Sequence, residues 1–452
     1  MSLDSYVADR NAVPQVSLAG LRFAILSTRN FVFLVAILAM NFTLFRPSPV
    51  DLLFVLAFLI TLVHIALQDR IEVSRRALLL SLLAASWLGS SVIASLPHIA
   101  DGAVVFELIS KTFAIAIAII GAFVSMTWNR RHFETFMKVY IVSSLIATML
   151  GTIGFLTQHP LLTWDGRAKG LIDDPNMYGT FLIPAAVFCV YYLPRTRYKL
   201  VVTAALGIVM LGILLSFSRI AVVGAMVCLF AYMAFQNRKN PRRLVLIAGG
   251  LVAIALVLLG IASVTSAEFT AKLLDRLTLA KSYDLGEEGR YHRYLLVIPM
   301  ILQNPFGIGV LQLEKIFPEP IHNVWLSSFV NYGWTGGIAW ISLVAGSVFV
   351  TIRNYRRTRN EITLALLFSL IGVILGATLH EGEHWRQMWL MFGLIWGFTS
   401  SRPGLTEPPP SPRAIRGHAR PAHMRRRATA SQRPVTARRK PQPIPGQIGP
   451  AR

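Results

Sequence analysis

The chain is organised around residues 267–323, which read AEFTAKLLDRLTLAKSYDLGEEGRYHRYLLVIPMILQNPFGIGVLQLEKIFPEPIHN. This is the only long polar interlude in an otherwise apolar sequence of 452 residues, of which 54% are hydrophobic. The mean hydropathy is +0.55, and a composition this apolar is typical of membrane proteins. Residues 267–322 are therefore expected to form one large loop between membrane-spanning helices.

Apolar segments of spanning or near-spanning length recur on both sides of this loop. About a dozen helices are predicted if each needs roughly twenty residues to cross the hydrocarbon core. The segments cover residues 30–45, 49–67, 77–96, 104–126, 133–157, 177–193, 198–215, 220–236, 244–266, 323–350, 361–379 and 386–400. The sequence thus predicts an all-α, polytopic integral membrane protein with about 12 transmembrane helices, in which a short segment, 1–29, precedes a membrane domain over residues 30–400.

Arginine and lysine gather in alternate loops, and this pattern predicts the orientation of the helices. With the N-terminus in the cytoplasm, the inner loops hold the larger basic clusters, which are Arg70 with Arg75 and Arg76, Arg130 with Arg131, Arg195 with Arg197 and Lys199, Arg238 with Lys239, Arg242 and Arg243, and Arg353 with Arg356, Arg357 and Arg359. The outer loops hold far fewer. Because basic residues are retained on the cytoplasmic side, both termini are predicted to be cytoplasmic and the loop over 267–322 to lie on the outer face.

Residues 401–452 form a separate basic tail. They hold twelve Lys or Arg against the single acid Glu407, so they account for half of the formal net charge of +22. The tail is rich in Pro, Arg and Ala and lacks Phe, Trp and Tyr, which predicts a disordered segment that associates with anionic membrane lipids at the cytoplasmic leaflet. A nucleic-acid-binding arm is the alternative, but no aromatic residues lie between the arginines to stack on bases. No nucleic-acid partner is expected.

Two helices are predicted inside the large loop. The apolar residues between Phe269 and Leu277 recur at helical spacing, which favours an amphipathic helix on the membrane surface. A second helix is predicted from about Arg290 to Gln303, with Tyr294, Leu295 and Ile298 on its apolar side. An Asn-Pro pair ends this helix, and the Gly-Ile-Gly that follows predicts a turn.

Four arginines are candidates for binding an anionic group at the outer face. Arg219 begins an apolar segment, Arg290 and Arg293 lie three residues apart in the large loop, and Arg167 lies in a shorter outer loop. A planar guanidinium binds a pair of phosphate oxygens and stays charged, and outer loops are otherwise depleted of arginine. The alternatives are a snorkelling arginine at the interface for Arg219, a solvated helix with local ion pairs for the arginines three apart, and a plain loop residue for Arg167.

His322 is the candidate general base. It stands directly before Asn323 and Trp325 at the start of an apolar segment, and Pro318 and Pro320 restrict the chain just before it. Neutral imidazole is the usual base near physiological pH. A lone histidine at an interface is more often structural, so the arginines expected nearby are the feature that favours a catalytic role.

A competing motif, HEGEH at residues 380–384, matches the H-E-x-x-H spacing of zinc proteases. In that interpretation His380 and His384 ligate the metal and Glu381 is the base. One unbroken helix over residues 361–400 would be about 60 Å long, so the chain is expected to turn at the glycine of the motif, where a zinc protease needs continuous helix. The alternative is a polar outer turn between two spans, without a metal.

Taken in order, these residues resemble the O-antigen ligase and O-antigen polymerase superfamily of bacterial membrane enzymes. The resemblance covers about residues 160–345. It rests on the segment from Gly170 to Asn176 that ends in Asp-Pro-Asn, on Ser218-Arg219, on Gly289-Arg290, on Asn304-Pro305 with Gly307 and Gly309, and on His322-Asn323 with Tyr332-Gly333 and Gly336. The basic tail and the His-Glu-rich turn depart from the pattern of the family.

The resemblance implies a metal-independent, inverting glycosyltransferase without a cofactor. Its donor would be a glycan on undecaprenyl pyrophosphate at the periplasmic face of the inner (cytoplasmic) membrane, and its acceptor a hydroxyl of a glycan or of lipid A-core. Arg219 and Arg290 would bind the pyrophosphate, and His322 would activate the acceptor hydroxyl, which Asn323 would orient. Further substrate contacts are assigned to Arg167, Arg293 and Asn176.

A transporter or flippase of a lipid-linked or anionic glycan is the alternative from another class of protein. In that case the same arginines would bind phosphate without any chemistry. Transporters place their binding groups near the bilayer midplane, often within inverted repeats, whereas the charged candidates here gather at one face. Polymerases, ligases and protein-glycosylating enzymes of the superfamily share one type of donor, and all three stay open.

Overall fold

Helix dominates the part of the chain that the computed structural model describes. This part comprises residues 18–45, 47–69, 74–238, 240–242, 245–246, 249–250, 289–317 and 321–398, with the single positions 252, 256 and 260. Its helices are α1 (Leu18–Ala39), α2 (Pro49–Ala66), α3 (Arg75–Ser95), α4 (Gly102–Met126), α5 (Arg130–Thr157), α6 (Pro175–Tyr192), α7 (Lys199–Leu215), α8 (Arg219–Gln236), α12 (Arg290–Gln303), α13 (Val324–Thr358), α14 (Glu361–Thr378) and α15 (Arg386–Gly397), with short 3-10 turns η2 (Leu96–His98), η3 (Leu313–Lys315) and η4 (Gly382–His384). The sheet found there is one antiparallel hairpin of β1 (Thr163–Trp164) and β2 (Arg167–Ala168).

Eight of these helices are long and apolar enough to cross a membrane. They are α1, α2, α3 with η2, α4, α5, α8, α13 and α14. α6, α7 and α15 coincide with three further predicted spans, although α7 has 17 residues and α15 has only 12. The predicted span at 244–266 lies largely outside the described residues, as do the tail at 401–452 and the surface helix near 269–277. The prediction of an all-α, polytopic membrane protein is confirmed.

The first helix begins earlier than the sequence predicts. The predicted start lies after Arg29, but α1 starts at Leu18 and carries Arg29 within the helix. Arg29 is only 1% exposed, and its guanidinium donates hydrogen bonds to Asn30 Oδ1 at 3.0 Å and to Thr127 Oγ1 at 2.5 Å. The charge of Arg29 suggests a helix boundary in the sequence. In the structure, however, Arg29 is a buried residue with polar partners.

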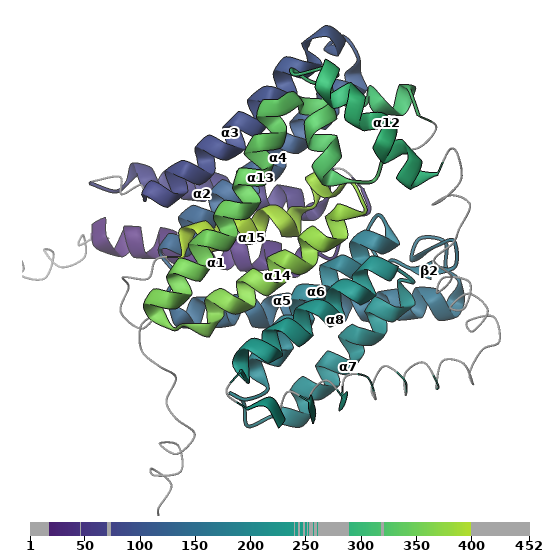
Figure 1. The fold of residues 1–452 in the computed structure, drawn as a ribbon. Helices are drawn as coiled ribbons and strands as arrows, with labels where there is room; N and C mark the ends of the chain where they lie inside the picture. The colour runs from purple at the N-terminus through teal and green to yellow at the C-terminus, as the bar shows by residue number, and fades with distance from the viewer. Residues whose placement is uncertain are drawn as a thin grey trace, which may run out of the picture. The chain divides into compact units, whose positions relative to one another are not determined.

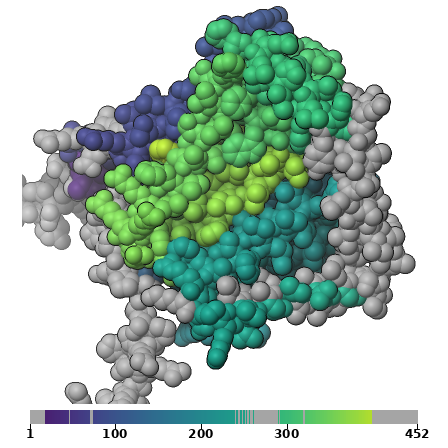
Figure 2. Space-filling view, viewed as in Figure 1, coloured from purple at the N-terminus to yellow at the C-terminus, as the bar shows by residue number. Residues whose placement is uncertain are grey.

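α14 lies between two groups of helices (Figure 1). It packs against α6 and α8 on one side and against α13 and α15 on the other. Small residues allow the close approach, since a Cβ added to Gly372 would lie 2.5 Å from Ile183 Cγ2 and one added to Gly376 would lie 2.5 Å from Thr180 Oγ1. Figure 2 shows the yellow-green helices between α13 in green and the teal helices that precede it in sequence. Both groups are thus tied to one central helix.

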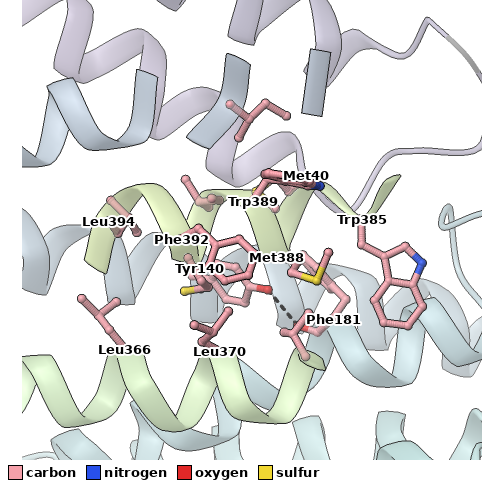
Figure 3. Close-up of a cluster of buried hydrophobic side chains, with 14 of the residues drawn as sticks. Met40, Tyr140, Phe181, Leu366, Leu370, Trp385, Met388, Trp389, Phe392 and Leu394 are labelled. Carbon is pink, nitrogen blue, oxygen red and sulfur yellow. Dashed lines mark hydrogen bonds between the residues drawn. The ribbon is translucent and has the colours of Figure 1, made fainter. Parts of the chain in front are cut away.

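α15 is the most deeply buried helix among those described, because all twelve of its residues are buried. It packs closely on α4, and a Cβ added to Gly393 would lie 2.3 Å from Ala118 O. Its first residue, Arg386, forms a buried two-point ion pair with Asp51 of α2 at 2.6 and 2.8 Å. Figure 3 shows its apolar side chains within a cluster to which α5, α6 and α14 also contribute, among them Met388, Trp389, Phe392, Leu394, Tyr140, Phe181, Leu366 and Leu370.

Candidate functional site

Most of the residues predicted as the site stand at helix termini. Arg219 begins α8, Asn176 lies in the first turn of α6, Arg290 begins α12, and His322 with Asn323 directly precedes α13. These starts meet the C-terminal ends of α7 and α14 through the contacts described below. We call this region the site end of the bundle.

The first group of residues at the site end is built around Arg167 of β2. Its Nε donates to Ser216 O at 2.8 Å, and its Nη2 donates to Asn176 Oδ1 at 2.7 Å. Ser216 begins the short turn between α7 and α8, whose helix cap is Ser218 and whose first helical residue is the half-buried Arg219. The β1–β2 hairpin therefore brings Arg167 to the turn that carries Arg219, although the two are far apart in sequence.

The Asp-Pro-Asn motif explains how Asn176 is positioned. Asp174 is the N-cap of α6, and its Oδ1 accepts hydrogen bonds from the backbone N–H groups of Asn176 and Met177 at 2.7 and 3.0 Å. Pro175 occupies the first helical position, where its missing N–H costs nothing and its φ already suits a helix. This cap fixes the start of α6 and directs the Asn176 amide to Arg167.

The second group of residues is built around His322. Its backbone has φ +50°, in the left-handed region where histidine is several-fold enriched over most other residues. Tyr294 of α12 donates from its hydroxyl to His322 O at 3.3 Å. The ring of His380, from the turn after α14, lies edge-on to the His322 ring with 5.7 Å between ring centroids. Three separate segments therefore meet at the predicted base.

Asn323 has a structural role that sequence reasoning missed. It is the N-cap of α13, and its Oδ1 accepts hydrogen bonds from the backbone N–H groups of Trp325 and Leu326 at 3.0 and 3.1 Å. Asparagine is among the best residues for the N-cap position. The position of Asn323 directly before an apolar run was the sequence signal for this role. The orientation of an acceptor by Asn323 stays a prediction.

Short contacts between α6, α13 and α14 join the two groups. Gly179 of α6 packs on the turn before α8, and the next residue, Thr180, packs on Gly376 of α14. Two residues further along α14, Thr378 Oγ1 accepts a hydrogen bond from Trp325 Nε1 at 3.0 Å. The turn with Arg219 and the segment with His322 consequently lie at the same end of the bundle, with the start of α6 and the end of α14 between them.

The glycines that follow α12 pack against a break in α13. Gly307 and Gly309 have φ +84° and +96°, and Gly333 has φ +73° where it interrupts α13. A Cβ on Gly307 would lie 2.5 Å from the backbone nitrogen of Gly333. The N–H of Trp334, left free by the break, donates to Pro305 O at 2.9 Å. The turn predicted here is confirmed, and it holds α12 against the helix that follows His322.

α12 runs from Arg290 to Gln303 as predicted, but its buried side differs from the prediction. Leu295 and Ile298 are 65% and 46% exposed, whereas Val297 is fully buried. Arg293 is only 3% exposed, so the interpretation of this arginine as a solvated charge is wrong. Arg293 and Val297 lie four residues apart, on a side of the helix that faces the protein interior. The Arg290 side chain lies outside the described part of the structure.

The HEGEH segment is a turn and not a helix. α14 ends at Thr378, η4 covers Gly382–His384, and α15 begins only at Arg386. His380 and His384 thus cannot occupy one helical face with Glu381 between them, and the predicted turn is confirmed. Within the described ranges, no group of three or more His, Cys, Asp or Glu side chains is arranged to hold a metal ion. The break in the helix contradicts the zinc-protease interpretation.

A buried charge cluster beside this turn escaped the sequence reasoning. Lys111 is 1% exposed, and its Nζ lies 3.0 Å from Glu107 Oε1 and 3.5 Å from Glu383 Oε2. Glu383 also accepts hydrogen bonds from Ser327 Oγ at 2.5 Å and Tyr332 Oη at 3.1 Å. The signal was available, because Glu107 and Lys111 stand four apart inside a predicted span, and charges within spans are functional candidates. We call these five residues the Lys111 cluster.

The carboxyl of Glu381, in the same turn, is expected to make stability depend on pH. Burial and then the negative charge of Glu383 raise the pKa of Glu381 from 4.5 to about 8. Because this pKa is higher in the folded than in the unfolded state, its contribution to stability is complete below the unfolded value and is lost as the pH rises through the folded value. Between about pH 5 and pH 9 the wild type should lose more thermal stability than Glu381→Gln. Unfolding midpoints in detergent across this range test the prediction, and parallel curves for the two proteins would contradict it.

The comparison with known families agrees with this geometry. Residues 204–341 match a family model described as O-antigen ligase. The match runs from within α7 into α13 and includes Arg219, Arg290, Arg293 and His322 with Asn323, whereas Arg167 and His380 lie outside it. No match was found among proteins with curated annotation. The resemblance inferred from the motifs is confirmed over residues 204–341, where this multi-pass membrane protein is similar to the O-antigen ligase family.

Proposed function

We propose that the protein is a polymerase or ligase of a bacterial surface polysaccharide, such as O-antigen or an exopolysaccharide. It transfers glycan from an undecaprenyl-pyrophosphate donor to an acceptor hydroxyl at the periplasmic face of the inner membrane. The observation that carries the proposal is the placement of two groups at the same end of the bundle, one with Arg167 and Arg219, the other with His322. Both Arg219 and His322 belong to the segment that matches the O-antigen ligase family.

The reaction needs a base and a stabilised leaving group. The acceptor oxygen bonds to the anomeric carbon of the donor glycan while the bond from that carbon to the pyrophosphate oxygen breaks, and the electron pair leaves with the pyrophosphate. His322 takes the proton of the acceptor hydroxyl. Arg219 and Arg290 stabilise the negative charge that develops on the pyrophosphate, as cations placed beforehand do in transition states.

The placement of Arg219 and His322 on different segments suits inversion at the anomeric carbon. In a single displacement the acceptor attacks from the side opposite the leaving group, so a base and a cation at the leaving group belong on different walls of the site, and Arg219 meets this requirement. Arg219 stands at the start of α8, and His322 stands before α13, with α6 and α14 between those segments. Arg167 holds the turn before α8 through Ser216 O, which keeps Arg219 on its own wall.

The proposed orientation follows from the loop charges. Both termini lie in the cytoplasm, where the basic tail associates with anionic lipid. The site end then faces the periplasm, where the donor is presented.

The experiment that tests the proposal follows release of polyprenyl pyrophosphate. Protein purified in detergent is supplied with a synthetic polyprenyl-pyrophosphate oligosaccharide and an acceptor glycan, with a chelator present. We expect release to persist with chelator and to fall by about 100-fold in Arg219→Ala, as for the loss of one transition-state cation or donor. Arg357→Ala is the matched control, since Arg357 is an exposed arginine in the last turn of α13 and its loss should leave the rate unchanged.

Two outcomes would reject the proposal. Tight donor binding without turnover, with every acceptor supplied, would indicate a transporter of lipid-linked glycan. Loss of release on chelation would indicate metal-dependent chemistry. An Arg219→Ala protein that turns over at the wild-type rate would instead remove Arg219 from the site.

A further inference from the structure

His380 is brought to His322 by a turn that is tightly constrained. The backbone N–H of His380 donates to Ala377 O at 3.2 Å, and that of Trp385 donates to Gly382 O at 3.0 Å. A Cβ on Gly382 would lie 2.5 Å from Ala377 Cβ, so the turn folds directly onto the end of α14. Trp385 in turn lies beside the His380 ring, with 6.4 Å between ring centroids.

Glu383 anchors this turn to the helix that follows His322. Its carboxylate accepts hydrogen bonds from Ser327 and Tyr332, both in the outer part of α13, and its backbone oxygen accepts from Trp389 Nε1 of α15 at 2.6 Å. Ser327 is the fourth residue of α13 and follows His322 by five residues. The turn with His380 and the segment with His322 are therefore tied together by the same carboxylate.

Lys111 holds Glu383 in place. It lies 3.5 Å from Glu383 and is enclosed by aromatic rings, with its Nζ 5.3 Å from the centroid of Tyr332 and 5.8 Å from that of Trp87. A buried carboxylate is costly unless a cation and hydrogen-bond donors contact it, and Glu383 has both. Because Glu383 is buried and held by an ion pair and several hydrogen bonds, the turn is restricted to a single arrangement.

We infer that His380 is a positioning residue that holds the ring of His322, and that the ion pair between Lys111 and Glu383 fixes His380 in that place. The inference rests on the proposed role of His322 as the base. A base works only when its nitrogen points at the proton to be removed, and a displacement of about 1 Å lowers rates by about 100-fold. His322 has a backbone conformation that leaves its ring in a loop, so a second ring packed edge-on is the natural means of orienting it.

The test measures both turnover and the environment of His322. We expect His380→Ala and Glu383→Gln each to lower kcat for polyprenyl-pyrophosphate release by about 10- to 100-fold, with KM for the donor within about twofold because the arginines are untouched. The second measurement is the rate at which diethyl pyrocarbonate modifies His322, read by mass spectrometry. This rate should rise in both variants, because His322 loses the ring that covers it.

Two matched controls separate positioning from general damage. His384→Ala removes the other histidine of the same turn, and Glu361→Gln removes the carboxylate that pairs with Arg195 at the opposite end of α14. Both should keep the wild-type kcat and the wild-type labelling rate of His322. His380 is only half-buried, so His380→Ala tests the inference even where Glu383→Gln reduces yield.

The outcomes distinguish this inference from the proposed function. If His322→Ala is inactive but His380→Ala keeps the wild-type kcat and labelling rate, the inference is overturned and the proposed function stands. If His322→Ala keeps its activity, the proposed base is wrong and the positioning role fails with it. Equal loss of kcat in His384→Ala and His380→Ala would also overturn the inference, because the inference assigns the positioning of His322 to His380 and gives His384 no part in it.

Discussion

Replacing His322 with alanine is expected to lower glycan transfer by about 1,000-fold, within the range for removal of a general base. The side chain is half-buried and lies before a helix start, so little packing is lost and the amount of protein in the membrane should not change. His322→Asn is the sharper variant, because asparagine also accepts a positive φ but cannot act as a base. Release of polyprenyl pyrophosphate and the glycan formed in cells are the two measurements.

The contradicting outcome for His322 is specific. An asparagine variant that retains more than about a tenth of the wild-type rate would be too active for the loss of a general base, and His322 would then be a structural residue. The amount of protein in the membrane, measured by immunoblot, identifies variants that are inactive only because they do not accumulate. Arg290→Ala is expected to match the loss in Arg219→Ala, as both arginines are assigned to the pyrophosphate.

Replacing Lys111 with methionine is expected to cause the largest loss of stability among single changes at the Lys111 cluster. Methionine keeps the length of the side chain but leaves Glu107 and Glu383 without their shared cation. Removing one partner of a buried ion pair costs about 3–5 kcal/mol, a large part of the stability of a typical domain. The unfolding midpoint and the yield of monodisperse protein in detergent should both fall.

A second change is expected to restore much of this loss. In the double variant with Lys111→Met and Glu383→Gln, the buried carboxylate is replaced by a neutral amide, whose oxygen keeps one of the two hydrogen bonds that Ser327 and Tyr332 donate to separate oxygens of Glu383. Neutralising both partners of a buried pair is often tolerated, whereas removing one is not. A double variant no more stable than Lys111→Met alone would contradict the assigned pairing. Glu361→Gln, at the partly exposed pair with Arg195, should cost less than about 1 kcal/mol.

The helical architecture was predictable because it depends on local composition. Apolar runs of spanning length predicted most of the described helices within a few residues, since a membrane leaves helix as the main way to satisfy backbone polar groups. The limits of α12 and the turn at Gly307 and Gly309 also followed from local signals, a proline and glycines at a helix end. The turn at Gly382 followed from a length argument alone.

The contacts between elements were not predictable in the same way. The packing of His380 on His322 joins two loops that are distant in sequence, and helical periodicity does not reveal which loops meet. Arg29 and Arg293 show the same limit, because a charge in the sequence indicates solvent or a boundary unless its buried partners are known. The Lys111 cluster was detectable in part, since its two residues in α4 are charges within a span, but Glu383 was interpreted only as part of the HEGEH motif.

The burial of α15 has a consequence for how the protein is made. With twelve residues it is about 18 Å long, well short of the roughly 30 Å hydrocarbon core, and it begins with the polar residues Arg386 and Gln387. Such a short segment with a polar start gains little free energy by entering the lipid bilayer alone. We expect it to join the bundle during biosynthesis only after α4, on which it packs, and Asp51 of α2, which pairs with Arg386, are in place. Chains that stop before Arg386 are then expected to be recognised as incomplete and degraded, whereas chains that stop shortly after Phe398 should assemble.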